Sequence, residues 1–177
     1  KYSGGTGEPN NPYLITTPQD LNSIGLYPAD WNKYFLMTAD INMVNIPGDS
    51  FNIIGSTSPY FTGVFDGNGY TINNLYISRS AADNTGLFGA LTSSRITNVG
   101  LTAINITGGN NTGGLVGSAE NTHIYYSYVD GSVSGADYVG ALVGNSVACA
   151  VWNSYATGSL SATGQHAGVL AGVNKGV

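Results

Sequence analysis

The stretch GGLVGS at 113–118 is rewritten at nearly fixed intervals, as TGLFGA at 85–90, GALVGN at 140–145 and GVLAGV at 168–173. The closing glycines of the four phrases are 28, 27 and 28 residues apart, at Gly89, Gly117, Gly144 and Gly172. A second phrase alternates with the first, as IYYSYVDGSVSG from 124 and VWNSYATGSLSA from 151, with looser copies from 96 and 72. Self-similarity at such a period is the signature of a repeat architecture.

Each period holds two or three short apolar runs separated by Gly, Asn, Ser or Asp. Val129 and Val133 alternate with the polar Asp130 and Ser132, which is the period of a half-buried strand. A repeat of this length with about three short strands fits one coil of a parallel β-helix, because a single coil cannot bury its apolar face alone. Equivalent residues should then form columns, with Leu87, Leu115, Leu142 and Leu170 in an internal ladder and Tyr128 beside Tyr155 in another.

The N-terminal part differs from the repeats. In TPQDLNSIGL, Thr17 is a candidate N-cap with Pro18 and Asp20 behind it, so we expect a short helix over 18–24 that Gly25 closes. A cap of this kind is expected on the first coil, which otherwise exposes unpaired backbone groups. After it, YFLM, DINM and FNIIG are predicted strands, and Asn68-Gly69 is a predicted tight turn.

These features predict an all-β fold, a parallel β-helix of about six to seven coils with a short N-terminal capping helix. We expect one domain over 1–177, with an extended segment and cap over 1–45 and coils over 46–177.

The repeats resemble the GLUG motif of large bacterial surface proteins, a group that includes amino-terminal regions of M26-type IgA-cleaving metallopeptidases and haemagglutinin-like adhesins. The likeness is carried by the GxLVG phrases with runs such as NSYATGSLSA from about residue 72, and by GGTGEPNNPYLITTPQDLNSI and FTGVFDGNGYTINNLYI. It implies a secreted or cell-surface, right-handed β-solenoid with an adhesive or structural role. Family repeats often place Cys where Ser127 and Ser154 stand here, and the HExxH phrase of the zinc peptidases is absent.

Composition argues against several classes of function. Charged residues make up 8% of the chain, against roughly 25% in ordinary proteins, and five basic residues with a net charge of -5 disfavour nucleic-acid binding. No apolar run is long enough to span a membrane, so we expect no membrane insertion. The single Cys149 lies in VACAV and is predicted to be a buried thiol.

The sequence offers little chemistry. Most acids stand at turn-like positions, including Asp66 and Asp130, and we interpret Arg79 and Arg95 as solvated loop residues, so no enzyme, cofactor or zinc site is expected. Calcium at the Asp66–Asn68 turn and ice binding stay weaker alternatives, as does a polysaccharide-degrading enzyme. An aromatic face that stacks on sugar rings is the stronger alternative, with Tyr125, Tyr126 and Trp152 as its residues.

The last phrase, HAGVLAGVNKGV, is still regular repeat, so the final coil should present an open strand edge. Two explanations are open: a fragment of a longer surface protein, or a subunit that docks on another copy. We therefore predict an extracellular structural or adhesive protein that self-associates head to tail into a filament. Its partners would be its own copies and, in the carbohydrate-binding alternative, glycans.

Overall fold

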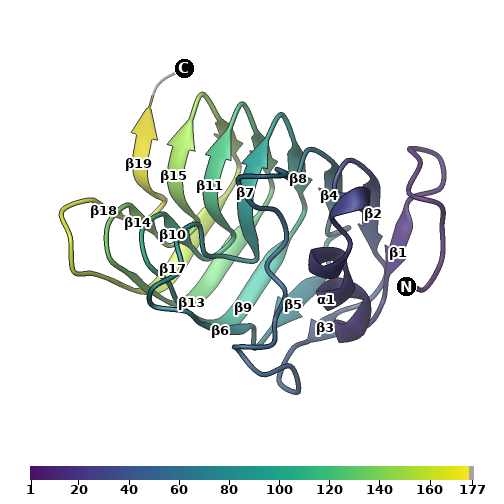
Figure 1. The fold of residues 1–177 in the computed structure, drawn as a ribbon, viewed down its shortest axis with the longest axis horizontal. Coiled ribbons are helices and arrows are strands. Elements are labelled where there is room, and N and C mark those ends of the chain that lie inside the picture. The colour runs from purple at the N-terminus through teal and green to yellow at the C-terminus, as the bar shows by residue number, and fades with distance from the viewer. Residues whose placement is uncertain (176–177) are drawn as a thin grey trace.

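A computed structural model describes residues 1–175 and shows a parallel β-solenoid of about five turns, whose coils stack along the long axis of the molecule (Figure 1). The predicted all-β parallel solenoid is confirmed, with fewer coils than the six to seven expected. The count is lower because residues 43–62 run mainly as loops and turns and do not complete regular coils.

Three sheets form the walls of the solenoid. The first contains β1 (Tyr13–Ile15), β2 (Tyr34–Met37), β4 (Val64–Asp66), β8 (Arg95–Thr97), β12 (His123–Tyr125) and β16 (Ala150–Trp152). The second contains β3 (Ile41–Asn42), β5 (Thr71–Asn73), β9 (Gly100–Thr107), β13 (Tyr128–Gly135) and β17 (Tyr155–Ala162), and β6 (Tyr76–Ser78) also pairs with β9. The third contains β7 (Phe88–Thr92), β11 (Val116–Glu120), β15 (Val143–Val147) and β19 (Ala171–Lys175). A narrow fourth ladder joins β10 (Thr112–Gly113), β14 (Val139–Gly140) and β18 (Ala167–Gly168).

The strand register reproduces the sequence period. Ile124 pairs with Ile96 in the preceding coil and with Val151 in the following one, 28 residues before it and 27 after it. In the third sheet, Val116 pairs in the same way with Phe88 and Val143. Repeated phrases therefore occupy equivalent places in successive coils.

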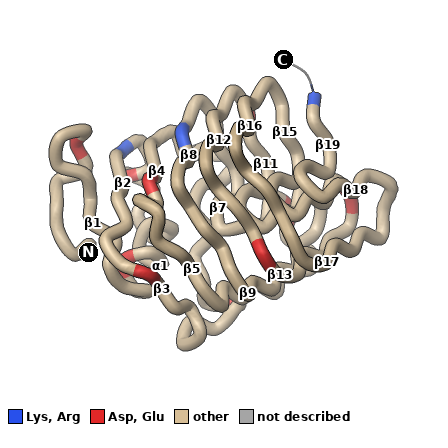
Figure 2. Tube along the Cα trace, turned by 180° about the vertical axis from the view of Figure 1, so that it is seen from behind, with Lys and Arg blue, Asp and Glu red and all other residues tan. Residues whose placement is uncertain are grey.

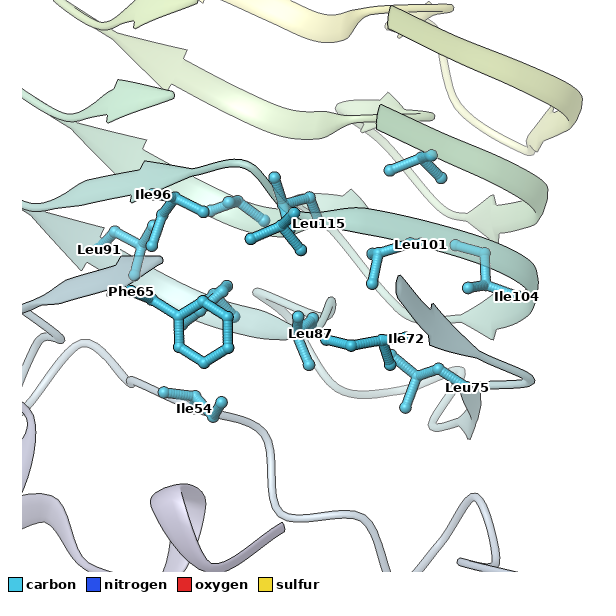
Figure 3. Packing of buried hydrophobic residues seen from close by; sticks show 14 of the residues in the cluster. Ile54, Phe65, Ile72, Leu75, Leu87, Leu91, Ile96, Leu101, Ile104 and Leu115 are labelled. Atoms are coloured by element: carbon cyan, nitrogen blue, oxygen red, sulfur yellow. The ribbon is translucent and has the colours of Figure 1, made fainter. Parts of the chain in front are cut away.

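The interior is a column of apolar side chains. Leu87, Leu115 and Leu142 have 0% exposure, and Figure 3 shows Leu87 and Leu115 among the isoleucines of neighbouring strands. Toward the N-terminal end the core becomes aromatic, with the ring centroids of Phe61 and Phe88 5.3 Å apart. Packed coils of this kind give the solenoid its hydrophobic stabilisation.

The bends between strands use left-handed backbone at equivalent positions. One column comprises Asn84, Asn111 and Tyr138; a second comprises Ser93, Asn121 and Ala148; a third comprises Asn98, Tyr126 and Asn153, all with φ between 46° and 55°. Asparagine tolerates this region well, which explains its frequency in the repeats. The glycines of the GxLVG phrase do not have positive φ. They are required by close approach instead, since a Cβ on Gly113 would collide with the Val116 carbonyl oxygen and one on Gly144 would lie 2.6 Å from the Gly117 carbonyl oxygen of the preceding coil.

The N-terminal helix α1 (Pro18–Leu26) has the predicted capping box, in which Thr17 and Asp20 satisfy each other's backbone amides. It runs two residues past the predicted end, and Gly25 lies inside it against the Asn52 backbone. The helix buries Leu21 and Ile24 in the core and is followed by a 3-10 turn, η1 (Pro28–Asp30). It lies near the N-terminal end of the solenoid (Figure 1).

Other predictions for this half have mixed outcomes. YFLM is β2, part of DINM is β3, and Asn68-Gly69 is a tight turn with φ of 54° and 79°. The strand predicted in FNIIG is wrong, because Ile54 makes only an isolated bridge with Phe88.

Candidate functional site

Five aromatic side chains gather where the first sheet turns into the second, in the last two coils. We call this set the aromatic corner: Tyr125, Tyr126, Tyr128, Trp152 and Tyr155. Tyr125 and Trp152 are paired in register and meet edge to face, with ring centroids 5.9 Å apart. Tyr128 and Tyr155 stack face to face, with centroids 5.2 Å apart and planes 5° apart.

The corner is held by two serines on the bends. The hydroxyl of Ser127 donates to the Tyr125 carbonyl and that of Ser154 to the Trp152 carbonyl, each at 2.9 Å. The Ser154 hydroxyl also accepts the Ser127 amide of the preceding coil at 3.1 Å. These bonds fix the bend from which Tyr126 projects with a φ of 50°, an uncommon conformation for a bulky residue.

The aromatic corner is open to solvent. Tyr126, Trp152 and Tyr155 are 61%, 64% and 56% exposed. Exposed aromatic faces of this kind are typical of binding surfaces, because a flat apolar ring can pack on a flat ligand at low entropic cost.

The structure also shows where the predicted leucine ladder lies. The amide of Leu115 donates to the Leu142 carbonyl at 3.0 Å, so these residues are direct neighbours in adjacent coils. Leu170 occupies the next place in the column, beside Leu142, but is 41% exposed because no described coil covers it.

A second surface feature was not anticipated from the sequence. On the outer face of the first sheet, hollows of about 480 and 600 Å³ meet at Tyr34, Val64 and Arg95. Arg95 pairs in register with Val64 on one side and His123 on the other. Figure 2 shows this face, where β2, β4, β8, β12 and β16 lie side by side with few charged residues. Tyr34, Val64, Arg95 and His123 are far apart in the sequence, and the order of the strands in the sheet brings them together.

Three predictions for charged side chains are corrected by the structure. Arg79 is half-buried and engaged: its guanidinium donates to the carbonyls of Phe51 at 2.7 Å and Asp49 at 3.2 Å, which fixes the loop. Arg95 lies in strand β8 and not in a loop. Asp130 lies within β13, where it accepts a hydrogen bond from the Thr157 hydroxyl at 2.8 Å.

The Asp66 turn uses its carboxylate internally, since one oxygen accepts the Asn68 amide and the Asn98 side chain at 2.8 and 3.0 Å. Over residues 1–175, no three His, Cys, Asp or Glu side chains come together in a way that could hold a metal ion. Within the same range, no helix has the length and apolar character needed to cross a membrane. Cys149 is buried, and its thiol donates to the Val147 carbonyl.

One coupled polar pair lies at the fourth ladder. His166 Nδ1 is 2.8 Å from Asp137 Oδ1, and its ring stacks on Tyr138. Partial burial raises the pKa of Asp137, but the hydrogen bonds from His166 and the Tyr138 amide outweigh this and leave the pKa below its usual value.

Comparison with known proteins decides the repeat type: residues 108–134 match the GLUG motif family. The chain carries a GLUG motif. It is 42% identical over 117 residues to halomucin of Haloquadratum walsbyi, which covers 64% of this chain and 1% of halomucin. It is 32% identical over 93 residues to a protein named as a Gly-rich membrane protein of Evansella cellulosilytica, covering 51% of this chain and 11% of that one. The chain therefore spans only a small part of these relatives.

A solved structure supports the fold. The crystal structure of a protein assigned as an immunoglobulin A1 protease from Bacteroides ovatus superposes with a TM-score of 0.62, over 96% of this chain and 64% of that chain. At 20% sequence identity this likeness establishes the solenoid architecture alone. The sequence-based identification of GLUG-type repeats is confirmed.

Proposed function

We propose that this GLUG-motif chain is a structural or adhesive module of a cell-surface protein, without catalytic activity. The observation that carries the proposal is the coil register, because in-register coils with few charges build an extended, mechanically continuous rod. A relative named as a membrane protein supports a surface location, and the matches, which occupy small parts of much longer chains, support a module of a larger protein. Protease shaving of intact source cells tests it: surface release of peptides from this chain is expected, and protection of the chain would refute it.

We further propose that copies of the chain associate through the last described coil. There Val169 and Leu170 are 64% and 41% exposed, whereas Leu142 one coil earlier is fully buried. Strands β17 and β19 each have one described neighbour, so their outer edges can accept another strand. Stacking a second copy on this coil would bury both the apolar side chains and the unpaired backbone groups.

The N-terminal end of the solenoid is less suited to pairing with another copy, which a head-to-tail filament would require. Ser3 and Gly4 form backbone hydrogen bonds with Leu14, so the outer edge of β1 is already occupied. Tyr2 packs on Tyr13 and Phe35, and its hydroxyl donates to Asp30. A head-to-tail filament would have to displace this segment, whereas a tail-to-tail contact would not.

Sedimentation velocity over a concentration series, with electron microscopy, tests the association. We expect dimers or filaments that dissociate on dilution and weaken in Val169→Asp, which places a charge on the exposed coil. The matched control is Val44→Asp, because Val44 is as exposed as Val169 but lies in the N-terminal half. A monomer at every concentration would refute self-association.

Glycan binding is the second candidate function, and the exposed aromatic corner favours it. A sugar ring could pack on Trp152, which Tyr125 meets edge to face, or on Tyr126, which projects from the bend that the serine bonds fix. A glycan array with wild type and Trp152→Ala tests this. Tyr60→Ala is the control, because Tyr60 is a partly exposed aromatic residue far from Trp152 in the sequence. Binding lost in Trp152→Ala and kept in Tyr60→Ala is expected; no glycan bound by wild type would refute it.

A further inference from the structure

The groove on the first sheet has the features of a ligand site. We call it the Arg95 groove; its floor is Tyr34, Val64, Arg95 and His123. Pro9 and Pro12 of the N-terminal hairpin form a wall of one hollow, and the bends at Ser93 and Asn121 line the other. His123 stacks on Tyr125, with ring centroids 5.6 Å apart and planes 19° apart, so the groove runs directly into the aromatic corner.

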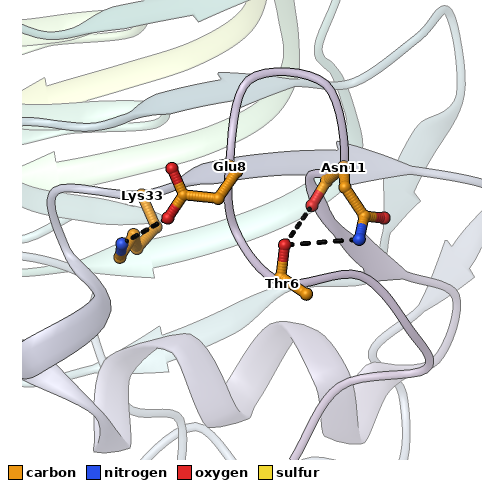
Figure 4. Close-up of polar contacts among 4 residues, drawn as sticks. All are labelled: Thr6, Glu8, Asn11 and Lys33. Carbon is orange, nitrogen blue, oxygen red and sulfur yellow. Dashed lines mark hydrogen bonds and ion pairs between the residues drawn. The ribbon is translucent and has the colours of Figure 1, made fainter.

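The hairpin wall is fastened in place. Asn11 accepts and donates hydrogen bonds with Thr6, and the Glu8 carboxylate pairs with the Lys33 ammonium at 2.8 Å (Figure 4). The Tyr34 amide, at the start of β2, donates to the Gly7 carbonyl at 3.0 Å. The groove is therefore preformed, which lowers the entropic cost of binding a ligand in it.

Arg95 is the unusual residue of this groove. Its guanidinium has no hydrogen-bond or ion-pair partner among the described residues, although it is exposed over a partly apolar floor. The three basic residues that precede Arg95 in the sequence are engaged: Lys33 with Glu8, Lys1 with Asp30, and Arg79 with two loop carbonyls. A guanidinium presents a planar fork of donors that matches a carboxylate in a bidentate manner.

The groove contains one carboxylate, that of Asp66. One of its oxygens already accepts hydrogen bonds from Asn68 and Asn98, as part of the turn. With a net charge of -5 on the chain and a single available cation here, a densely charged polyanion would be repelled. The charges of the groove instead fit a ligand whose carboxylates are widely spaced, so that a single carboxylate contacts Arg95.

We propose that the Arg95 groove binds a short acidic saccharide, with a uronate-type carboxylate held by Arg95 and sugar rings against Tyr34 and the His123–Tyr125 stack. The inference rests on the proposed glycan binding and specifies the class of sugar and its path along the outer face of the first sheet. Contacts between the sugar rings and the aromatic side chains provide the apolar part of recognition, and Arg95 provides selectivity for acidic over neutral sugars.

Isothermal titration with a galacturonic acid trimer and its fully methyl-esterified form tests the proposal, because the two differ in charge but keep the same rings. We expect wild type to bind the acid trimer about tenfold more tightly than the ester, an advantage that falls as salt rises. Arg95→Gln should lose this advantage and bind both forms equally, and Arg95→Lys should keep part of it. Lys175→Gln is the charge-matched control on another sheet and should behave as wild type.

Arg95 is exposed, so its replacement leaves the core intact, and an unchanged Tm confirms that a variant is folded. Equal binding of the acid and ester forms by wild type would overturn the role of Arg95 while leaving glycan binding standing. Binding of the acid form that Arg95→Gln does not weaken would have the same meaning. Absence of binding to either trimer, with array binding still lost in Trp152→Ala, would overturn the groove alone, whereas no glycan binding anywhere would overturn both.

Discussion

Truncating two leucines of one column should cost very different amounts of stability, although the chemical change is identical. Leu115 has 0% exposure between coils, whereas Leu170 is 41% exposed on the last described coil. Leu115→Ala should lower the free energy of unfolding by about 3–5 kcal/mol, the range for leucines whose removal leaves an enclosed cavity. Leu170→Ala removes a partly buried side chain and leaves no enclosed cavity, so its cost should be about 1 kcal/mol.

Urea unfolding followed by far-UV circular dichroism, at a protein concentration low enough to keep the chain monomeric, measures both variants. A terminal coil can unfold separately in a solenoid, so Leu170→Ala should mainly broaden the start of the transition, while Leu115→Ala should shift the whole curve. Equal losses in the two variants, or a larger loss for Leu170→Ala, would contradict the placement of Leu115 in an inner coil and of Leu170 in the last described coil.

Three further substitutions test local features. Burial raises the pKa of Asp20, but hydrogen bonds from the Ser3 hydroxyl and two backbone amides lower it below the usual value. Asp20→Asn should therefore cost about 0.5–2 kcal/mol at neutral pH. Thermal melts should show this difference shrinking as pH falls below about 4, the pKa of an unfolded Asp, and being lost as pH falls through the lower pKa of the folded carboxylate. Tyr126→Asn should raise Tm by a few degrees, because asparagine tolerates the left-handed backbone at this bend better than tyrosine; a fall in Tm would contradict the strain. Gly114→Ala should lose about 1–3 kcal/mol in denaturant unfolding, because the new Cβ meets the Ala141 carbonyl oxygen; a neutral effect would show that the coils are not so closely packed.

The repeats made the core of the fold predictable. Each coil contributes the same buried positions, so the spacing of the glycine phrases was enough to place Leu87, Leu115 and Leu142 in one column. The capping box of α1 was predictable for a related reason, since Thr17, Pro18 and Asp20 act locally. Where the period is lost, between 43 and 62, the strand predicted at FNIIG failed.

The surface was harder to predict, because its properties arise between coils. The partners of Arg79 lie about a coil away in sequence, on a loop without repeat character. The meeting of Tyr34, Arg95 and His123 depends on the exact strand order of the first sheet. The need for glycine at Gly114 also arises between coils, because a Cβ there would meet the Ala141 carbonyl oxygen of the next coil.

The central claim is that coils stack in register, and paired cysteines test it most directly. In a Cys149→Ser background, Ser132→Cys with Ser159→Cys should form a disulfide on mild oxidation, because these residues pair in adjacent coils with hydroxyl oxygens 2.8 Å apart. Ser132→Cys with Ser161→Cys is the control, shifted by two residues, which puts the Cα atoms about 8 Å apart and out of bonding range. Mass spectrometry should find the first cross-link and not the second; the reverse pattern, or equal cross-linking of both pairs, would contradict the stacked-coil fold.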